Sequence, residues 1–291
     1  MRKNPVFIIL GTLISFNLLA WMAVWELRGS GLEVTFFDVG QGDAAFIETP
    51  ERMQILIDGG PTSVILEKLG KEMPFWDRTI DWIILTHPEK DHLSGLIEVL
   101  KSYNVKNILW TGIVRDTAEY REWQKLIKEE GAGIVIAKAG MCALSDSAQS
   151  CALSESAHVD ILYPFESLEG KELKDSNDTS IIAKLVFGKI SFLFTGDATQ
   201  SVEKELVRGP TPHNLDSDVL KVGHHGSKTS TSKEFVKAVS PEVAVISAGK
   251  NNSYGHPHRE VLDNLAGINI LRTDLDGDIK IISDGVNYTV N

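Results

Sequence analysis

Hydrophobic and polar positions divide the chain into one long apolar stretch and a region of short, regularly interrupted segments. Residues 6–25, VFIILGTLISFNLLAWMAVW, carry no charged side chain. At about 1.5 Å per residue, a helix of this length spans about 30 Å, the thickness of a bilayer's hydrocarbon core. We therefore expect residues 1–30 to form a membrane anchor and linker, and residues 31–291 to form one folded domain.

The apolar stretch has a rival interpretation as a cleavable signal peptide. Such peptides have a shorter apolar core and small residues at the cleavage site, and the segment VWELRGSG here lacks that site. Trp21 and Trp25 lie near the distal end of the stretch, where aromatic residues favour the membrane interface. Arg2 and Lys3 favour a cytoplasmic N-terminus and an extracytoplasmic domain, although Arg28 after the stretch weakens this asymmetry.

Beyond residue 31, apolar segments bounded by glycine, proline and polar turns predict strands, and apolar residues at helical spacing predict helices. The predicted strands are 32–38, 43–48, 53–58, 79–85, 107–110, 133–137, 159–163, 181–187, 190–194, 219–222, 243–247, 279–282 and 288–290. The predicted helices are 93–103, 117–130, 200–207, 233–239 and 257–265, and residues 139–157 and 166–178 are expected loops. This order suits an α/β fold in which two sheets pack face to face with helices outside, an αββα four-layer sandwich.

The composition fits a globular core, and the charge limits the kind of partner. The formal charge is −11, and the part after residue 30 is more acidic still, because residues 1–30 hold three of the 29 basic and one of the 40 acidic side chains. Tight nucleic-acid binding needs a basic surface, so this balance argues against tight DNA holding. Brief contact with DNA stays open, because a bound divalent metal adds local positive charge.

The two cysteines, Cys142 and Cys151, lie in a segment rich in serine and alanine. They lack the spacing of a zinc-ligand pair. Two unpaired loop thiols and a disulfide both remain open, the latter if the domain lies outside the cytoplasm.

The segment LTHPEKDHLSG, residues 85–95, concentrates metal-binding side chains where a predicted strand ends. His87, Glu89, Asp91 and His92 offer nitrogen and oxygen ligands that zinc, manganese or iron accept. Loops that follow strand ends collect functional residues in layered α/β folds. The plain alternative is a solvated helix start that Asp91 caps.

Two further strand ends carry similar residues. Asp197 follows the apolar strand 190–194, although it could also cap the next helix, and His224 and His225 lie between glycines after strand 219–222. Adjacent imidazoles without partners would be costly if buried, which favours a metal or substrate role. His256 and His258 in YGHPH could shape the rim of a site or be plain surface residues. His158 and His213 are not expected to take part.

Taken together, these motifs resemble the metallo-β-lactamase superfamily, and more closely the hydrolase domain of ComEC-type DNA-internalisation proteins. The resemblance covers residues 32–290. Its carriers are FFDVGQGDA (36–44), ILIDGG (55–60), THPEKDHLSG (86–95), NDTS (177–180), FTGD (194–197), LKVGHHGSKTS (220–230) and YGHPH (254–258). The combination of DVGQGD and GHHGS in this order is specific.

The resemblance implies a role for each matching residue. His87 would bind one metal, Asp91 and His92 the other, Asp197 would bridge them, and His225 would complete the second site. Asp58 would support the ligand loop from behind. Residues expected to shape the floor near the metals or to contact substrate are Asp38, Gln41, Asp43, Asn177, Ser227, Lys228, Ser230 and His256; for Ser227, Lys228 and Ser230, a polar surface turn is an equal alternative.

Two departures from the superfamily pattern bear on the metal. Glu89 stands where a second histidine is usual, and it remains a candidate ligand. Its oxygen atoms favour harder metals, so they increase the expected preference of the site for Mn²⁺ relative to Zn²⁺. Asn177 and its neighbours replace the histidine expected before Asp197, which weakens the first metal position. We expect one or two divalent ions, Zn²⁺ or Mn²⁺.

The implied activity is a metal-dependent phosphodiesterase or DNase outside the membrane, acting in DNA uptake or degradation. Asp91, Asp197 and His224 would be catalytic, with Asp197 orienting the nucleophile and His224 binding a phosphoryl oxygen or protonating the leaving group. One apolar span predicts that this chain cannot conduct DNA alone, so a separate channel protein is a candidate partner. The alternatives are hydrolysis of a cell-wall phosphorylcholine ester, with Trp76, Trp82 and Trp110 near the choline or simply in the core, and a non-catalytic binding module.

Overall fold

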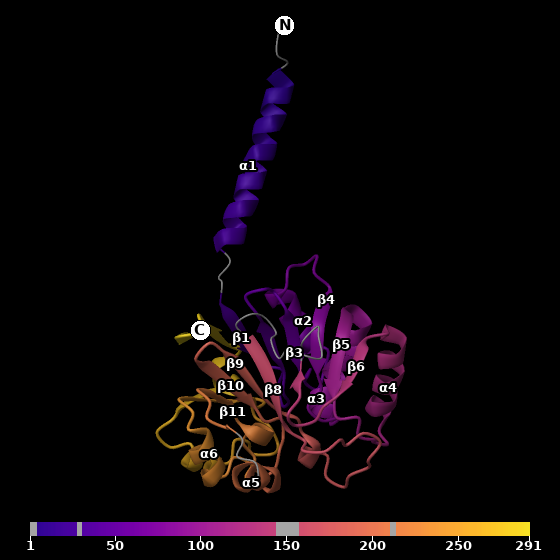
Figure 1. Cartoon of the computed structure of the whole chain (residues 1–291), viewed down its shortest axis with the longest axis vertical. Helices are drawn as coiled ribbons and strands as arrows, with labels where there is room; N and C mark the ends of the chain where they lie inside the picture. Colours follow the sequence, from indigo (N-terminus) through magenta and orange to yellow (C-terminus); the bar gives the residue numbers. More distant parts are fainter. Residues whose placement is uncertain (1–4, 28–30, 144–156, 210–213) are drawn as a thin grey trace.

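The computed structural model describes residues 5–27, 31–143, 157–209 and 214–291. Two sheets face each other in the folded part of the chain, and helices cover their outer faces (Figure 1). The first half of the domain supplies most of one sheet and the second half most of the other. The α/β sandwich predicted from the sequence is confirmed.

The first sheet has eight strands. In sheet order they are β15 (Tyr288–Val290), β14 (Ile279–Ser283), β1 (Leu32–Phe36), β2 (Ala45–Glu48), β3 (Gln54–Ile57), β4 (Thr79–Ile84), β5 (Asn104–Trp110) and β6 (Gly133–Ile136). Strands β3 to β6 run parallel, whereas β1 pairs antiparallel with both β2 and β14. The C-terminal hairpin therefore completes a sheet that the N-terminal strands begin.

The second sheet has seven strands. In sheet order they are β13 (Asn269–Arg272), β12 (Val243–Ile246), β11 (Val219–Lys221), β10 (Ile190–Phe194), β9 (Ile182–Phe187), β8 (Ala157–Tyr163) and β7 (Cys142–Ala143). Strands β10 to β13 run parallel to one another, and β9 forms the predicted hairpin with β10. Cys151 lies outside the described residues, so the alternatives for the cysteines stay open.

The main core lies between the sheets, where inward-facing residues of both meet. The rings of Phe36 and Phe194, one from each sheet, stack with centroids 5.8 Å apart. Three helices cover the outer face of the first sheet: α2 (Val64–Glu72), α3 (Lys90–Ser102) and α4 (Ala118–Glu130). The second sheet carries α5 (Gln200–Arg208), α6 (Lys233–Val239) and α7 (Arg259–Asn264), and the short turns η1 (Asn177–Thr179), η2 (Gly223–Gly226) and α8 (Thr273–Asp276) follow or join strands.

Several of these elements depart from the sequence expectations. Strand β7 and the start of η1 lie in segments expected to be loops, 139–157 and 166–178, because β7 pairs only two residues with β8 and η1 is a single short turn. Helix α2 was not predicted; Ser63 at its N-cap makes no side-chain cap hydrogen bond, and Gly70 interrupts its nine residues. Strand β13 is short and only partly buried, so it lacks a clear period-two pattern. Helix α8 follows β13, so the helix predicted at 257–265 is not the last one.

Strand direction gives the domain two distinct ends. Strands β1, β3 and β4 all point in the same direction, from one end of the domain to the other. Strands β10 to β13 finish at that second end, where the sequence motifs follow them. We call the end where β1 begins the anchor end, and the end where β4 finishes the site end. Figure 1 shows α1 beside the anchor end, and α5 and α6 at the opposite end.

Helix α1 (Pro5–Leu27) stands apart from the domain core (Figure 1). The window Pro5–Met22 has a mean hydropathy of 1.9, and none of it is buried in the protein. By length and composition it is the one helix among the described residues that could cross a membrane.

Candidate metal centre

The first group of site residues comes from the junction of β4 and α3. His87 lies three residues beyond the end of β4, and Asp91 and His92 lie in the first turn of α3. Two glycines let the loop after β3 pack directly on this helix. A Cβ atom on Gly95 would lie 1.8 Å from the carbonyl oxygen of Gly59, so only glycine fits there. This contact fixes α3 against the loop that carries Asp58.

The second group follows β10 and β11. Asp197 comes three residues after β10, and His224 and His225 lie in η2 after β11. Both histidines have left-handed backbone angles, with φ of 49° and 55°. Non-glycine residues adopt this conformation rarely and at some cost, and such strained residues are enriched at functional sites.

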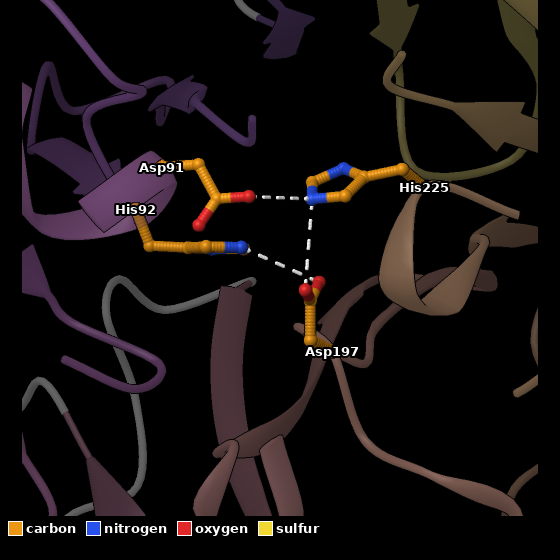
Figure 2. A group of neighbouring side chains, drawn as sticks. All are labelled: Asp91, His92, Asp197 and His225. Carbon is orange, nitrogen blue, oxygen red and sulfur yellow. Dashed lines mark hydrogen bonds and ion pairs between the residues drawn. The ribbon is translucent and has the colours of Figure 1, made fainter. Parts of the chain in front are cut away.

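Asp91, His92, Asp197 and His225 converge into one cluster (Figure 2). Each offers one ligand atom, and these four atoms lie within 4.8 Å of one another. Asp197 is central: its Oδ1 lies 3.3 Å from His92 Nε2, and its Oδ2 lies 3.5 Å from His225 Nε2. His225 Nε2 is also 3.2 Å from Asp91 Oδ2. Two imidazoles and two carboxylates at this spacing form a plausible set of ligands for Zn²⁺ or Mn²⁺.

Buried polar atoms without a hydrogen-bond partner support this assignment. His87 Nε2, His92 Nε2 and Asp197 Oδ1 are buried and make no hydrogen bond. Leaving such atoms unsatisfied is costly, so a cluster of them needs an explanation such as an ion. The residues therefore fit the divalent metal that their arrangement implies.

A buried carboxylate holds His92 from behind. Asp58 Oδ2 lies 2.8 Å from His92 Nδ1, and Thr86 donates to both Asp58 oxygens, through its backbone N–H and its hydroxyl. This leaves Nε2 of His92 facing the cluster. Carboxylate–histidine pairs of this kind orient the ring and increase its basicity toward a metal.

His225 is held in a comparable way. Its Nδ1 lies 3.0 Å from the carbonyl oxygen of Ser247 and 3.2 Å from Asp43 Oδ1. Asp43 in turn forms a buried ion pair with Lys221, Nζ to Oδ2, at 2.5 Å. Burial would raise the pKa of Asp43, but Lys221 and His225 hold it well below its usual range, so it stays ionised.

The titration of the cluster reflects its crowded charges. Burial alone would lower the pKa of His225, but the carboxylates of Asp197 and Asp43 raise it to about 10. The pKa of His92 is also raised, by Asp197 and Asp58 against the effect of burial. His87 behaves in the opposite way, because burial and the neighbouring His92 lower its pKa to about 3. His87 is thus neutral and able to act as a ligand throughout the physiological range.

His87 lies slightly apart from the four-residue cluster. Its Nε2 is 4.0 Å from Asp197 Oδ2, and its ring centroid is 4.2 Å from that of His92. A first metal on His87 would share Asp197 with the cluster. Glu89, the other candidate ligand for this position, instead pairs with Arg115 at 2.5 Å and accepts a hydrogen bond from the Ser176 hydroxyl. Glu89 as a ligand remains a prediction, and it requires this carboxylate to leave both partners.

The rim of the cluster is formed by His224, His256 and the loop after η2. His224 Nε2 lies 3.6 Å from Asp197 Oδ2, while its Nδ1 is 3.1 Å from the Thr229 hydroxyl. The ring of His256 lies 5.7 Å from that of His224, and Gln41 Nε2 is 3.4 Å from His256 Nδ1. Burial and the neighbouring His225 lower the pKa of His256 to about 4, so it is neutral at pH 7.

The remaining predicted site residues take several positions. Lys228 is exposed on the rim, whereas Ser227 is buried, with its hydroxyl 3.0 Å from Thr229 Oγ1. Ser230 is also buried and donates to the carbonyl oxygen of Gly223, which is a structural contact. Asn177 is half-buried at the start of η1. Substrate contact by Lys228 and Asn177 stays a prediction.

Sequence reasoning gave no role to Lys221, Arg115 or Thr229. Each acts through a partner: Lys221 through Asp43, Arg115 through Glu89, and Thr229 through His224. The partners of Lys221 and Arg115 are distant in the sequence, whereas Thr229 and His224 belong to the same motif. One signal was available for Lys221, because a lysine at the end of an apolar strand needs a partner when it is buried.

The fold is that of a known superfamily of metallo-hydrolases. Residues 37–250 match the metallo-beta-lactamase superfamily, and the chain belongs to it. The structure also resembles that of the metallo-beta-lactamase fold protein YhfI from Bacillus subtilis, with a TM-score of 0.56, 11% identity, and coverage of 90% of this chain and 100% of that one.

The chain also has curated relatives among competence proteins of the ComEC type. The chain is 35% identical over 277 residues to ComE operon protein 3 of Bacillus subtilis, covering 88% of this chain and 34% of that protein. It is 32% identical over 252 residues to competence protein ComA of Neisseria gonorrhoeae, covering 85% of this chain and 32% of that protein. The chain thus spans about a third of the length of these relatives. It is a metallo-hydrolase related to competence proteins.

Proposed function

We propose that the domain hydrolyses phosphodiester bonds of DNA on the outer side of the membrane that residues 6–25 span. The observation that carries the proposal is the cluster of Asp91, His92, Asp197 and His225, in which buried ligand atoms of His92 and Asp197 make no hydrogen bond. The competence proteins among the relatives favour DNA as the substrate.

A bound Zn²⁺ or Mn²⁺ would act as a Lewis acid and lower the pKa of a coordinated water from 15.7 to about 7. The side chains around it have separate tasks. The carboxylate of Asp197 orients the attacking water, because both of its oxygens face the cluster. His224, whose Nε2 faces Asp197 while Thr229 holds Nδ1, is placed to give a proton to the leaving oxygen.

The acidic charge of the chain fits transient contact with DNA. The formal charge of −11 gives no general attraction for phosphate, so affinity depends on the metal and on rim groups such as Lys228. Gln41, Asn177 and His256 complete the proposed substrate contacts. We expect the domain to bind DNA weakly and to cleave it repeatedly along its length. This behaviour suits the degradation or processing of DNA during uptake.

The membrane side of the proposal rests on α1 and its flanks. The apolar window Pro5–Met22 is long enough to span, and Arg2 and Lys3 before it favour a cytoplasmic N-terminus. The domain would then lie outside, beside a channel-forming partner that conducts the DNA. A phosphorylcholine ester is the alternative substrate, but Trp82 and Trp110 are buried in the core and are not available to enclose choline.

The test is cleavage of DNA by the full-length protein in detergent, stripped of metal and reloaded with Mn²⁺ or Zn²⁺. Linear single- and double-stranded DNA are the substrates. Asp91→Asn exposes contaminating nuclease, and Asp263→Asn, an exposed carboxylate paired with Arg259, is the matched control. We expect metal-dependent cleavage in the wild type and in Asp263→Asn only. Absence of cleavage with metal bound would reject DNA and leave cell-wall phosphodiesters to be tested.

A further inference from the structure

The anchor end carries an exposed aromatic turn that neither the metal site nor the core uses. Phe75 and Trp76 occupy the tip of the loop between α2 and β4, and their side chains are 82% and 56% exposed. Phe75 is the most exposed large hydrophobic side chain among the described residues. Two adjacent exposed aromatic residues favour an apolar or interfacial environment.

The turn is held in a fixed shape. The N–H of Asp77 donates to the carbonyl oxygen of Pro74 at 2.9 Å, which closes the turn around the two aromatic residues. Asp77 is itself fixed, because its side chain accepts hydrogen bonds from the Gln54 amide and from the N–H of Thr79. The rings of Phe75 and Trp76 meet edge to face at 4.8 Å. The turn therefore presents its rings without first having to order them.

Covalent connection places this turn close to the bilayer. Only four Cα–Cα steps, at most about 15 Å, separate Leu27 at the end of α1 from Gly31 before β1. Because β1 and β4 both begin at the anchor end, the turn that precedes β4 faces the same side as α1 (Figure 1). The ring of Trp76 lies 6.3 Å from that of Trp21, which lies one residue before the end of the apolar window of α1.

Basic side chains offset part of the negative charge around the turn, which reduces its repulsion by an anionic membrane. The carboxylates nearby are largely paired: Asp81 with Lys106 at 2.7 Å, and Glu33 and Glu72 with Lys280 at 3.1 and 2.5 Å. Tryptophan near the end of a membrane span favours the headgroup region, where an aromatic ring can be partly buried.

We propose that the turn of Phe75 and Trp76 inserts into the interface of the bilayer that α1 spans, and so fixes the orientation of the domain. The occupant of this surface is the lipid bilayer. β4 has six residues and spans about 20 Å. The candidate metal site, which lies beyond the C-terminal end of β4, then faces away from the membrane toward a substrate in solution. This inference rests on the membrane anchoring in the proposed function, but not on the identity of the substrate.

The test uses tryptophan fluorescence of the full-length protein in vesicles of phosphatidylethanolamine and phosphatidylglycerol, with and without lipids brominated near the headgroup. The difference in emission between wild type and Trp76→Phe reports Trp76, and the same difference in a Trp21→Phe background excludes energy transfer from Trp76 to the neighbouring Trp21. The corresponding difference for Trp21→Phe reports the anchor, and that for Trp82→Phe reports a core ring 5% exposed. We expect brominated lipid to remove more than about half of the emission of Trp76 and Trp21, and to leave Trp82 unchanged.

The outcomes separate the two proposals. Quenching of Trp21 without quenching of Trp76 overturns the insertion of the turn and leaves the anchor intact. Absence of quenching for both residues rejects the membrane anchoring and the insertion together. DNA cleavage is measured separately in detergent, so its failure bears on the substrate and not on this inference.

Discussion

The two ends of the sheets are built from the same strands but differ in which kind of group is left unsatisfied. At the site end, polar atoms of His87, His92 and Asp197 are buried without a hydrogen bond, although the carboxylate and hydroxyl behind them, those of Asp58 and Thr86, are hydrogen-bonded. At the anchor end, Phe75 and Trp76 are exposed while the charged groups near them are paired. We interpret the buried polar atoms without hydrogen bonds as ligands of a metal, and the exposed aromatic rings as a contact with lipid.

The largest effect is expected at the centre of the cluster. Asp197→Asn keeps the shape of the side chain but removes the charge that faces His92 and His225. Hydrolysis should fall by about 10³-fold or more, because the ligands and the oriented water act as a unit. The readout is the initial rate of phosphodiester cleavage with saturating metal. A loss of less than tenfold would mean that Asp197 is not central to the chemistry.

A buried and an exposed ion pair give the next contrast. Lys221→Met leaves the buried Asp43 without its cation and should lower the free energy of unfolding by about 3–5 kcal/mol. Lys106→Met removes the partner of Asp81 at the anchor end, where Lys106 is 57% exposed, and should cost about 1 kcal/mol or less. Urea denaturation measures both. Equal losses would show that the two ends do not differ in this respect.

A smaller loss is expected for the residue that holds His92 from behind. Asp58→Asn keeps a hydrogen-bond acceptor but removes the charge beside Nδ1. Metal affinity or activity should fall by about 10–100-fold, as for other carboxylates behind metal-bound histidines. Titration calorimetry with Zn²⁺ gives the affinity, and Asp263→Asn, which removes the exposed partner of Arg259, is the control. Unchanged affinity in Asp58→Asn would remove this support role.

Metal affinity should also depend on pH. The pKa of His225 is raised to about 10 without metal, so the ring is protonated at neutral pH and a metal must displace its proton. Since protons compete with the ion, affinity should rise by about tenfold per pH unit for each displaced proton, until pH approaches that pKa. Calorimetry at pH 6.5 and 7.5 in buffers of different ionisation enthalpy counts the protons. No proton release would contradict a ligand role for His225.

The smallest effect is expected at the anchor end. Trp76→Ser should change the free energy of unfolding by less than about 0.5 kcal/mol and leave hydrolysis in detergent unaltered, because the ring is exposed and far from the cluster. Thermal unfolding in detergent checks this. A large destabilisation would mean that Trp76 packs within the domain instead of facing lipid.

The sequence predicted the fold class and most strands because their apolar segments are bounded by clear turns, as in 190–194 and 243–247. It also placed the metal-binding residues at strand ends, and the parallel strands then bring Asp91, Asp197 and His225 together. What it could not give was the pairing of Asp43 with Lys221, 178 positions apart, which exists only once β11 lies beside the loop after β1. Helix α2 was missed for a different reason: it is short, contains Gly70, and Ser63 at its N-cap makes no side-chain cap hydrogen bond.

The most direct test of the central claim is the metal content of the full-length protein after loading with Mn²⁺ or Zn²⁺ and extensive dialysis. Elemental analysis of wild type, Asp197→Asn and Asp263→Asn gives ions bound per chain. The account predicts at least one tightly bound ion in the wild type and in Asp263→Asn, and its loss in Asp197→Asn. Wild-type protein that is folded but retains no ion, or Asp197→Asn that retains it fully, would contradict the account.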